Sequence, residues 1–293
     1  MTTQPRQQRT LARPAILEGR GYWTGRDVRV EFHPAEAGTG LRFRRMDLPG
    51  SPPIPALVHH RVEAARRTTL RMAAATVEMV EHVLSALVGL QVDNCEIRVN
   101  QQELPGNDGS SRDAVESILS AGIVAQDALR SALVIREPLR IEDGSQWIEF
   151  HPPSGTTGFL VRYELDYSDV PSVGRQTVEF DLTADTYQSQ IASARTFVTL
   201  AEANWLKSQG LGGHASYQDL LVFDDHGPIE NTLRFSDECA RHKVLDLVGD
   251  FALAGCDFRG RVVAHRTGHR LNAAMVREVL KRHAMDFLQR KSA

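Results

Sequence analysis

Histidine and aspartate side chains recur at spacings that suit a metal site. In the segment RHKVLDLVGD, His242 and Asp246 are four residues apart, so a helix would place both side chains on one face. His82, in the segment VEHVLSALVG, offers a third ligand. Two histidines, one aspartate and an open fourth position form the ligand pattern of a catalytic zinc site. A lone His-Asp pair at this spacing is more often a surface ion pair, so the interpretation depends on whether the fold brings His82 to His242.

Two glutamates precede His82 and compete for a role at the same site. Glu81 adjoins His82, so along a helix its side chain points in a different direction. Glu78 is four residues before His82 and would form a ligand pair with it. Spacing alone does not choose between these two carboxylates.

The elements that would carry these residues occur twice. VEFHPAEAGTGLRF, at residues 30–43, returns as IEFHPPSGTTGFLVRY, at residues 148–163, and each predicts two strands joined by a Gly/Thr turn. His82 begins HVLSALVG and His242 begins HKVLDLVG, and each motif runs into a strand-like segment with a cysteine. Two repeated motifs in the same order indicate a duplication. If the equivalent helices packed about a pseudo-dyad, His82 would approach His242.

Each copy reads strand, strand, helix, strand, helix, which predicts an α+β domain with helices on one face of a mostly antiparallel sheet. We expect residues 1–126 to form the N-terminal copy and residues 127–293 to form the C-terminal copy, with the boundary in a polar stretch near residues 122–131. The candidate site residues that the spacing gives are Glu81 and His82 in the first copy and His242 and Asp246 in the second.

The second copy is longer than the first. From the histidine of EFHP to the helical histidine there are 82 − 33 = 49 residues in the first copy and 242 − 151 = 91 in the second. The difference, 91 − 49 = 42 residues, lies mostly at residues 176–223. An insertion in one copy only is where specialised function is expected.

Composition excludes several classes of function. The 293 residues carry a net charge of −3, which gives no electrostatic case for binding nucleic acid. The longest strongly apolar stretch, residues 83–92, is about half as long as a membrane-spanning helix, and the N-terminus lacks the apolar core of a secretion signal. Three scattered cysteines, none in a CxxC pair, disfavour a disulfide framework and a thiolate zinc site. We therefore expect a cytoplasmic protein.

The chain resembles the LpxC family, the zinc-dependent UDP-3-O-acyl-N-acetylglucosamine deacetylases of lipid A synthesis. The resemblance runs nearly end to end and keeps one order. The segments that carry it are QRTLARP, RRMDLPG, LSALVGLQVDNCEIRVN, ELPGNDGSS, IASARTF, LRFSDECARHKVLDLVGD and TGHRLN. It implies an α+β fold of two duplicated β-α-α-β-type domains, with helices packed between two sheets and the active site between the copies. It also implies hydrolysis of the substrate's acetamide.

The resemblance also implies roles for single residues. The implied metal ligands are His82, His242 and Asp246, which would hold zinc, with ferrous iron as the alternative. The implied catalytic residues are Glu81 as general base, His269 as general acid or imidazolium, Asp250 as its orienting partner and Thr196 as a group that stabilises the oxyanion. The implied substrate contacts are Phe197, Lys243 and Leu211, with Asp108 as a polar support near the metal. Glu78 would fall outside the site.

The implied partner is a small molecule, an acylated UDP-amino sugar, bound by a monomer. An acylated substrate is compatible with transient contact at a membrane surface, although no basic amphipathic helix requires it. The chain departs from the family at Trp23, Met79, Gln91 and the segment GLGGHASYQD, which includes His214. These departures leave two alternatives open: a divergent paralogue that deacetylates a different N-acetylated sugar or amide, and a non-catalytic zinc-binding protein.

Overall fold

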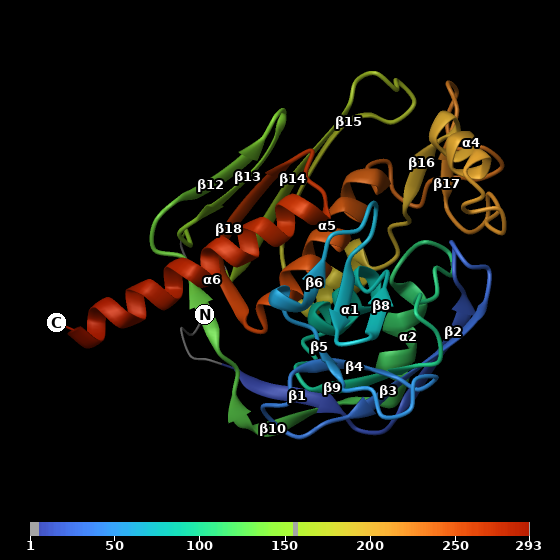
Figure 1. Cartoon of the computed structure of the whole chain (residues 1–293). Helices are drawn as coiled ribbons and strands as arrows, with labels where there is room; N and C mark the ends of the chain where they lie inside the picture. Colours follow the sequence, from blue (N-terminus) through green and yellow to red (C-terminus); the bar gives the residue numbers. More distant parts are fainter. Residues whose placement is uncertain (1–5, 155–157, 293) are drawn as a thin grey trace.

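The computed structural model describes residues 6–154 and 158–292. The first five residues of the expected N-terminal copy, the last residue of the expected C-terminal copy and the Gly/Thr turn at residues 155–157 lie outside this part. Two mixed sheets with helices between them form the bulk of the described chain (Figure 1). The predicted α+β architecture, with helices packed between two sheets, is confirmed.

The N-terminal sheet has the strand order β2-β3-β9-β4-β5. Its strands are β2 (Ala15–Arg20), β3 (Asp27–Pro34), β9 (Cys95–Val99), β4 (Leu41–Arg45) and β5 (Ile54–Pro55). Strand β9 runs antiparallel to β3 and parallel to β4. Alternate residues of β3, namely Val28, Val30 and Phe32, are buried, as the two-residue period of a strand with one face on the core requires.

The C-terminal sheet has the equivalent order β12-β13-β18-β14-β15, with a short strand β11 beside β18. Its strands are β11 (Ala132–Val134), β12 (Leu139–Asp143), β13 (Gln146–His151), β14 (Phe159–Tyr167), β15 (Gly174–Asp181) and β18 (Asp257–His265). Strand β18 runs antiparallel to β13 and parallel to β14, as β9 does to its own neighbours. Strand β3, which contains EFHP, and strand β13, which ends at the histidine of its EFHP, therefore occupy the same place in the two sheets.

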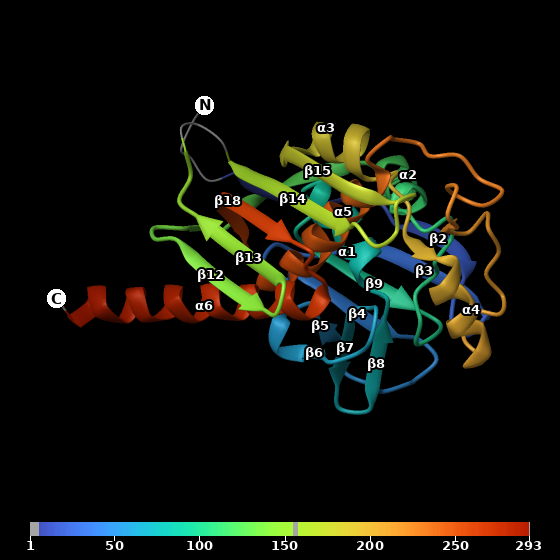
Figure 2. The same cartoon turned by 90° about the horizontal axis from the view of Figure 1, so that it is seen from above.

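Two central helices position the candidate site. Helices α1 (Glu81–Gly89) and α5 (Glu238–Phe251) lie side by side between the sheets, α2 (Arg112–Ala121) packs beside β2, and α6 (His269–Ser292) packs across β12 and β13 (Figures 1 and 2). None of these described helices is long and apolar enough to cross a membrane.

A glycine allows the close approach of α1 and α5. A Cβ atom added at Gly249 would lie 2.1 Å from the carbonyl oxygen of Glu81, so no larger residue fits without moving a helix. One turn away, the Ser85 hydroxyl donates a hydrogen bond of 2.8 Å to the carbonyl of Leu245. The glycine of the repeated Leu-Val-Gly motif thus sets the distance between the helix that carries His82 and the helix that carries His242.

Both halves carry additional structure between the sheet and the central helix. In the second half, β16 (Phe197–Thr199) and β17 (Leu221–Phe223) pair in parallel and are joined through α4 (Leu200–Ser208), after a short turn of α3 (Ala184–Thr186). In the first half, β6 (Arg61–Val62), β7 (Thr69–Met72) and β8 (Ala75–Glu78) form an antiparallel sheet. The extra elements are therefore not restricted to one copy, because the 49-residue interval of the first half already contains an inserted sheet.

The segment between the halves is itself a strand. Strand β10 (Ile123–Leu129) pairs antiparallel with β1 (Gln7–Leu11) in a two-stranded ribbon. Nearby, Arg6 contacts both Asp93, at 2.6 Å, and Asp257, at 2.8 Å, so one guanidinium joins the first half to the last strand of the second.

Candidate active site

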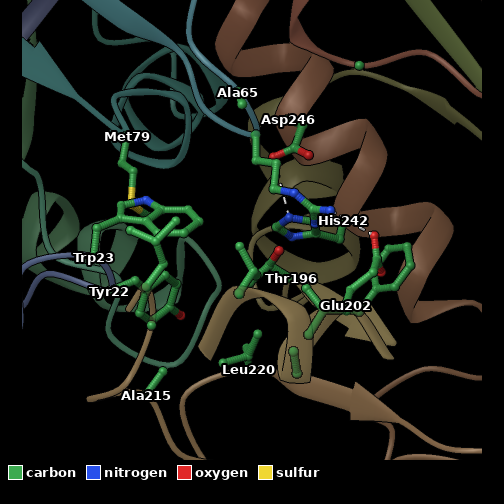
Figure 3. A pocket seen from close by; sticks show the side chains of 18 of the residues that line it. Tyr22, Trp23, Ala65, Met79, Thr196, Glu202, Ala215, Leu220, His242 and Asp246 are labelled. Atoms are coloured by element: carbon green, nitrogen blue, oxygen red, sulfur yellow. Dashed lines mark hydrogen bonds and ion pairs between the residues drawn. The ribbon is translucent and has the colours of Figure 1, made fainter. Parts of the chain in front are cut away.

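Three metal-ligating side chains converge where α1 meets α5. The Nε2 atoms of His82 and His242 lie 3.6 and 3.4 Å from Oδ1 of Asp246, and all three potential ligand atoms lie within 4.8 Å of one another. The two imidazole rings stand at 88° with their centroids 5.1 Å apart. Figure 3 shows His242 and Asp246 together on one side of the cavity. The fold therefore brings together the three residues whose types and spacing suggested a metal site.

The protonation and hydrogen bonding of these residues fit a divalent cation. Burial lowers the pKa of His242 to about 3, so its imidazole is neutral, and its Nδ1 donates to the carbonyl of Ala194 at 3.1 Å, which turns Nε2 toward the cluster. Oδ1 of Asp246 is buried and accepts no hydrogen bond within the described residues. A buried, unpaired carboxylate oxygen that faces two imidazole nitrogens is a donor set suited to a metal.

Lys243 holds the second oxygen of the same aspartate. Its Nζ donates to Oδ2 of Asp246 at 2.7 Å. Burial disfavours the charged form of both groups. His242 and Lys243 nevertheless hold the pKa of Asp246 well below its usual range, and Asp246 raises the pKa of Lys243. Asp246 is therefore ionised at neutral pH, as a metal ligand must be.

Glu81 and His269 face each other beside the three ligands. Glu81 begins α1, and its Oε1 lies 3.8 Å from Nε2 of His269, which begins α6. Oε2 of Glu81 accepts a hydrogen bond of 2.9 Å from the backbone N–H of Thr68. Burial raises the pKa of Glu81, although His269 and His82 oppose this effect. A carboxylate whose pKa is raised by burial suits a group that accepts and returns a proton.

His269 is held as a cation by buried carboxylates. Its Nδ1 lies 2.9 Å from Oδ2 of Asp250, a residue with no exposed surface. Burial alone would lower the pKa of His269, but Asp250 and Glu81 outweigh it and raise that pKa to about 9. The imidazole is therefore protonated at neutral pH and can donate from Nε2 toward the metal cluster.

The other sequence-predicted site residues line the same cavity, which has a volume of about 1010 Å³. Thr196 lies next to His242 in Figure 3, at the residue before β16. The ring of Phe197 stands edge-on to Tyr167 at 5.3 Å, and Nζ of Lys243 lies 6.0 Å from the Phe197 ring centre. Leu211 is 37% exposed and lines the cavity after α4.

Two acidic residues considered from the sequence lie elsewhere. Glu78 ends strand β8 instead of sharing α1 with His82, and its carboxylate pairs with Arg67 at 3.1 Å. The four-residue helical spacing therefore does not apply to it. Asp108 pairs with Arg234 at 2.7 Å and does not line the cavity, but its neighbour Gly109 accepts a 2.8 Å hydrogen bond from the N–H of Thr196.

Two polar residues beside the site were missed by sequence reasoning. The hydroxyl of Thr68 and the side-chain amide of Asn272 both donate to Asp250, at 2.5 and 2.9 Å. Asn272 carries a signal, since it lies three residues after His269 in TGHRLN and so one helical turn away. Thr68 carries none, because it precedes a short strand far from α5 in the sequence.

Two of the residues expected to depart from the family, Trp23 and Met79, lie on one wall of the cavity. Figure 3 shows Trp23 and Met79 together, with Tyr22 below them and across the cavity from His242. The Tyr22 hydroxyl donates a 2.6 Å hydrogen bond to the carbonyl of Asp219, in the altered segment that follows Leu211. This wall therefore joins the N-terminal glycine motif to the insertion of the second half.

Comparison with known proteins gives the same assignment as the motifs. The family described as UDP-3-O-acyl N-acetylglycosamine deacetylase, LpxC, matches residues 8–281. The curated UDP-3-O-acyl-N-acetylglucosamine deacetylases of Brucella ovis, Brucella canis and Brucella abortus are each 37% identical to this chain over 275 residues, which cover 93% of this chain and 95% of theirs. This chain belongs to the LpxC family of deacetylases.

Proposed function

We propose that this protein is a zinc-dependent UDP-3-O-acyl-N-acetylglucosamine deacetylase of lipid A biosynthesis. The observation that carries the proposal is the convergence of His82, His242 and Asp246 beside the facing pair Glu81 and His269. The names of the relatives supply the substrate, and their similarity extends over 93% of this chain. Ferrous iron is the alternative ion, because neutral imidazoles and a carboxylate bind both metals.

The protein's part in the reaction is to orient the acetamide and to move two protons. The chemistry that a divalent cation supplies at such donors is polarisation of the amide carbonyl and a water of lowered pKa. Glu81 would accept the proton that water loses as its oxygen attacks the acetamide carbon. His269, as an imidazolium, would give a proton to the nitrogen as the C–N bond breaks. Water is consumed, and acetate and a free amine are released.

Four further residues of the cavity would stabilise the oxyanion or contact the substrate. The Thr196 hydroxyl lines the cavity beside His242 and can donate a hydrogen bond to an oxyanion. Lys243, whose Nζ donates to Asp246, also lines the cavity and would contact the substrate. Phe197 and Leu211 offer apolar surface for the rest of the substrate.

The proposal includes the setting of the enzyme. The active site would lie between an N-terminal copy, residues 1–126, and a C-terminal copy, residues 127–293. The enzyme would act as a cytoplasmic monomer that meets an acylated substrate, with at most transient contact at a membrane surface.

The test is acetate release by purified protein from UDP-3-O-acyl-N-acetylglucosamine, with and without a chelator, beside a short N-acetylated sugar. The proposal predicts chelator-sensitive release from the acylated nucleotide sugar. Release from the short sugar alone would support the divergent paralogue, whose motivation is the altered wall of Trp23, Met79 and the segment around His214. Bound metal with no release from either compound would support a non-catalytic zinc protein.

A further inference from the structure

Thr68 contacts both groups that would handle protons, although it belongs to neither central helix. It lies between β6 and β7 and has no exposed surface. Its backbone N–H donates to Oε2 of Glu81 at 2.9 Å, and its hydroxyl donates to Oδ1 of Asp250 at 2.5 Å. The second distance is typical of a short hydrogen bond from a hydroxyl to a carboxylate.

These contacts complete a ring of four residues. Thr68 holds one oxygen of Glu81 and one oxygen of Asp250. The other oxygen of Asp250 accepts from His269 Nδ1 at 2.9 Å, and Nε2 of His269 faces the other oxygen of Glu81 at 3.8 Å. Thr68 thus contacts Glu81 directly and His269 through Asp250.

We propose that Thr68 is a positioning residue for the deacetylation, one that sets the orientation of Glu81 through its main chain and of His269 through Asp250. The inference rests on the proposed function. Glu81 and His269 would act on the two sides of one amide bond, so their separation must match the substrate within a fraction of an ångström.

The hydroxyl is needed because of how the Asp250 carboxylate is shared. Oδ2 accepts from both His269 and Asn272, whereas Thr68 is the partner that the described residues provide for Oδ1. Without the hydroxyl, Oδ1 of Asp250 would be buried and unpaired. The carboxylate could then rotate until Oδ1 accepts the hydrogen bond that Asn272 now donates to Oδ2. The His269 ring would then lose its fixed direction toward Glu81.

The neighbouring residue provides a matched control. Thr69 is also a buried threonine, at 3% exposure, but its hydroxyl has no hydrogen-bond partner in the described residues. Replacing Thr69 with valine removes a buried hydroxyl from the next residue, the first of β7, without removing a contact to either proton-transfer group. A merely structural role for buried threonines here would make the two substitutions alike.

The experiment compares Thr68→Val, Thr68→Ser and Thr69→Val in the full-length, metal-loaded protein. We expect Thr68→Val to lower kcat about 10- to 100-fold, with KM and bound metal little changed, because the substitution acts on a residue behind the reacting groups. Thr68→Ser keeps the hydroxyl and should recover most of kcat. Thr69→Val should keep wild-type kcat. Thr68→Ala serves if Thr68→Val does not fold.

Each other outcome overturns the positioning role. Wild-type kcat in Thr68→Val or Thr68→Ala would show that the hydroxyl is not needed, and equal losses in the Thr68 and Thr69 variants would point to packing alone. No recovery in Thr68→Ser would exclude the hydroxyl as the cause. Absence of acetate release by the wild-type protein, measured first, would instead overturn the proposed function and the inference with it.

Discussion

The carboxylate of Glu81 and the imidazole of His269 face each other at 3.8 Å, although one begins α1 in the first half and the other begins α6 in the second. Each is tied on its far side to a buried partner, Glu81 to the Thr68 backbone and His269 to Asp250. A carboxylate and an imidazole that is protonated at neutral pH are thus held beside the His82, His242 and Asp246 cluster.

Glu81→Gln should lower kcat by about 100- to 10,000-fold while the protein keeps its metal, because glutamine fills the same space but cannot accept a proton. Acetate release and metal content, measured on one sample, test this. Glu78→Gln is the control, since Glu78 pairs with Arg67 away from the cavity. Normal turnover in Glu81→Gln would move the general base to another residue.

Asp246→Ala should remove most of the bound metal, because it takes away the unpaired carboxylate oxygen that faces both histidines. The measurement is the metal content of the purified variant. Asp237→Asn, at the start of the same helix, is the control because its carboxylate pairs with Arg241 instead. A full equivalent of metal in Asp246→Ala would contradict the ligand set.

Asp250→Asn should shift the alkaline limit of activity to lower pH. His269 is faced by Asp250 and Asp246 from α5 and by Glu81 from α1, and these carboxylates raise its pKa to about 9 against the effect of burial. The imidazolium is therefore present below that pH and is lost as pH rises through it. An asparagine removes the nearest negative charge, so the proton is lost at lower pH. An unchanged alkaline limb in kcat against pH would show that His269 is not the group that titrates.

Gly249→Ala should destabilise the fold by about 1–3 kcal/mol and weaken metal binding, because the added methyl group would lie 2.1 Å from the Glu81 carbonyl and push α1 from α5. Chemical denaturation and metal content measure the two effects. Gly213→Ala is the control, since nothing lies within 4 Å of a Cβ atom there. Equal stability of the two variants would contradict the close-packing account.

Much of the His82, His242 and Asp246 cluster could be predicted because it depends on local periodicity and on duplication. The four-residue spacing of His242 and Asp246 holds wherever α5 forms, and the echo of their motif around His82 indicated an equivalent helix. The two sheets share one strand order, so α1 and α5 are equivalent elements that meet in the centre. The roles assigned to these residues stay predictions until the variants are measured.

The start of α1 could not be placed from periodicity. Met79 has a φ of 58°, a left-handed conformation that interrupts the chain between β8 and the helix, and this excludes Glu78 from the helical face of His82. The contacts of Thr68 could not be predicted either, because they depend on a backbone N–H and on a loop placed by long-range packing. The neighbouring strands β6, β7 and β8 have two to four residues, too few for an alternating pattern to appear.

The measurement that tests the central claim most directly is zinc titration of chelator-treated protein, with acetate release from UDP-3-O-acyl-N-acetylglucosamine as the signal. A site built from His82, His242 and Asp246 predicts that activity returns in proportion to added zinc and levels off at about one ion per chain. Full activity in the metal-free protein, or no activity at any zinc concentration, would contradict the account.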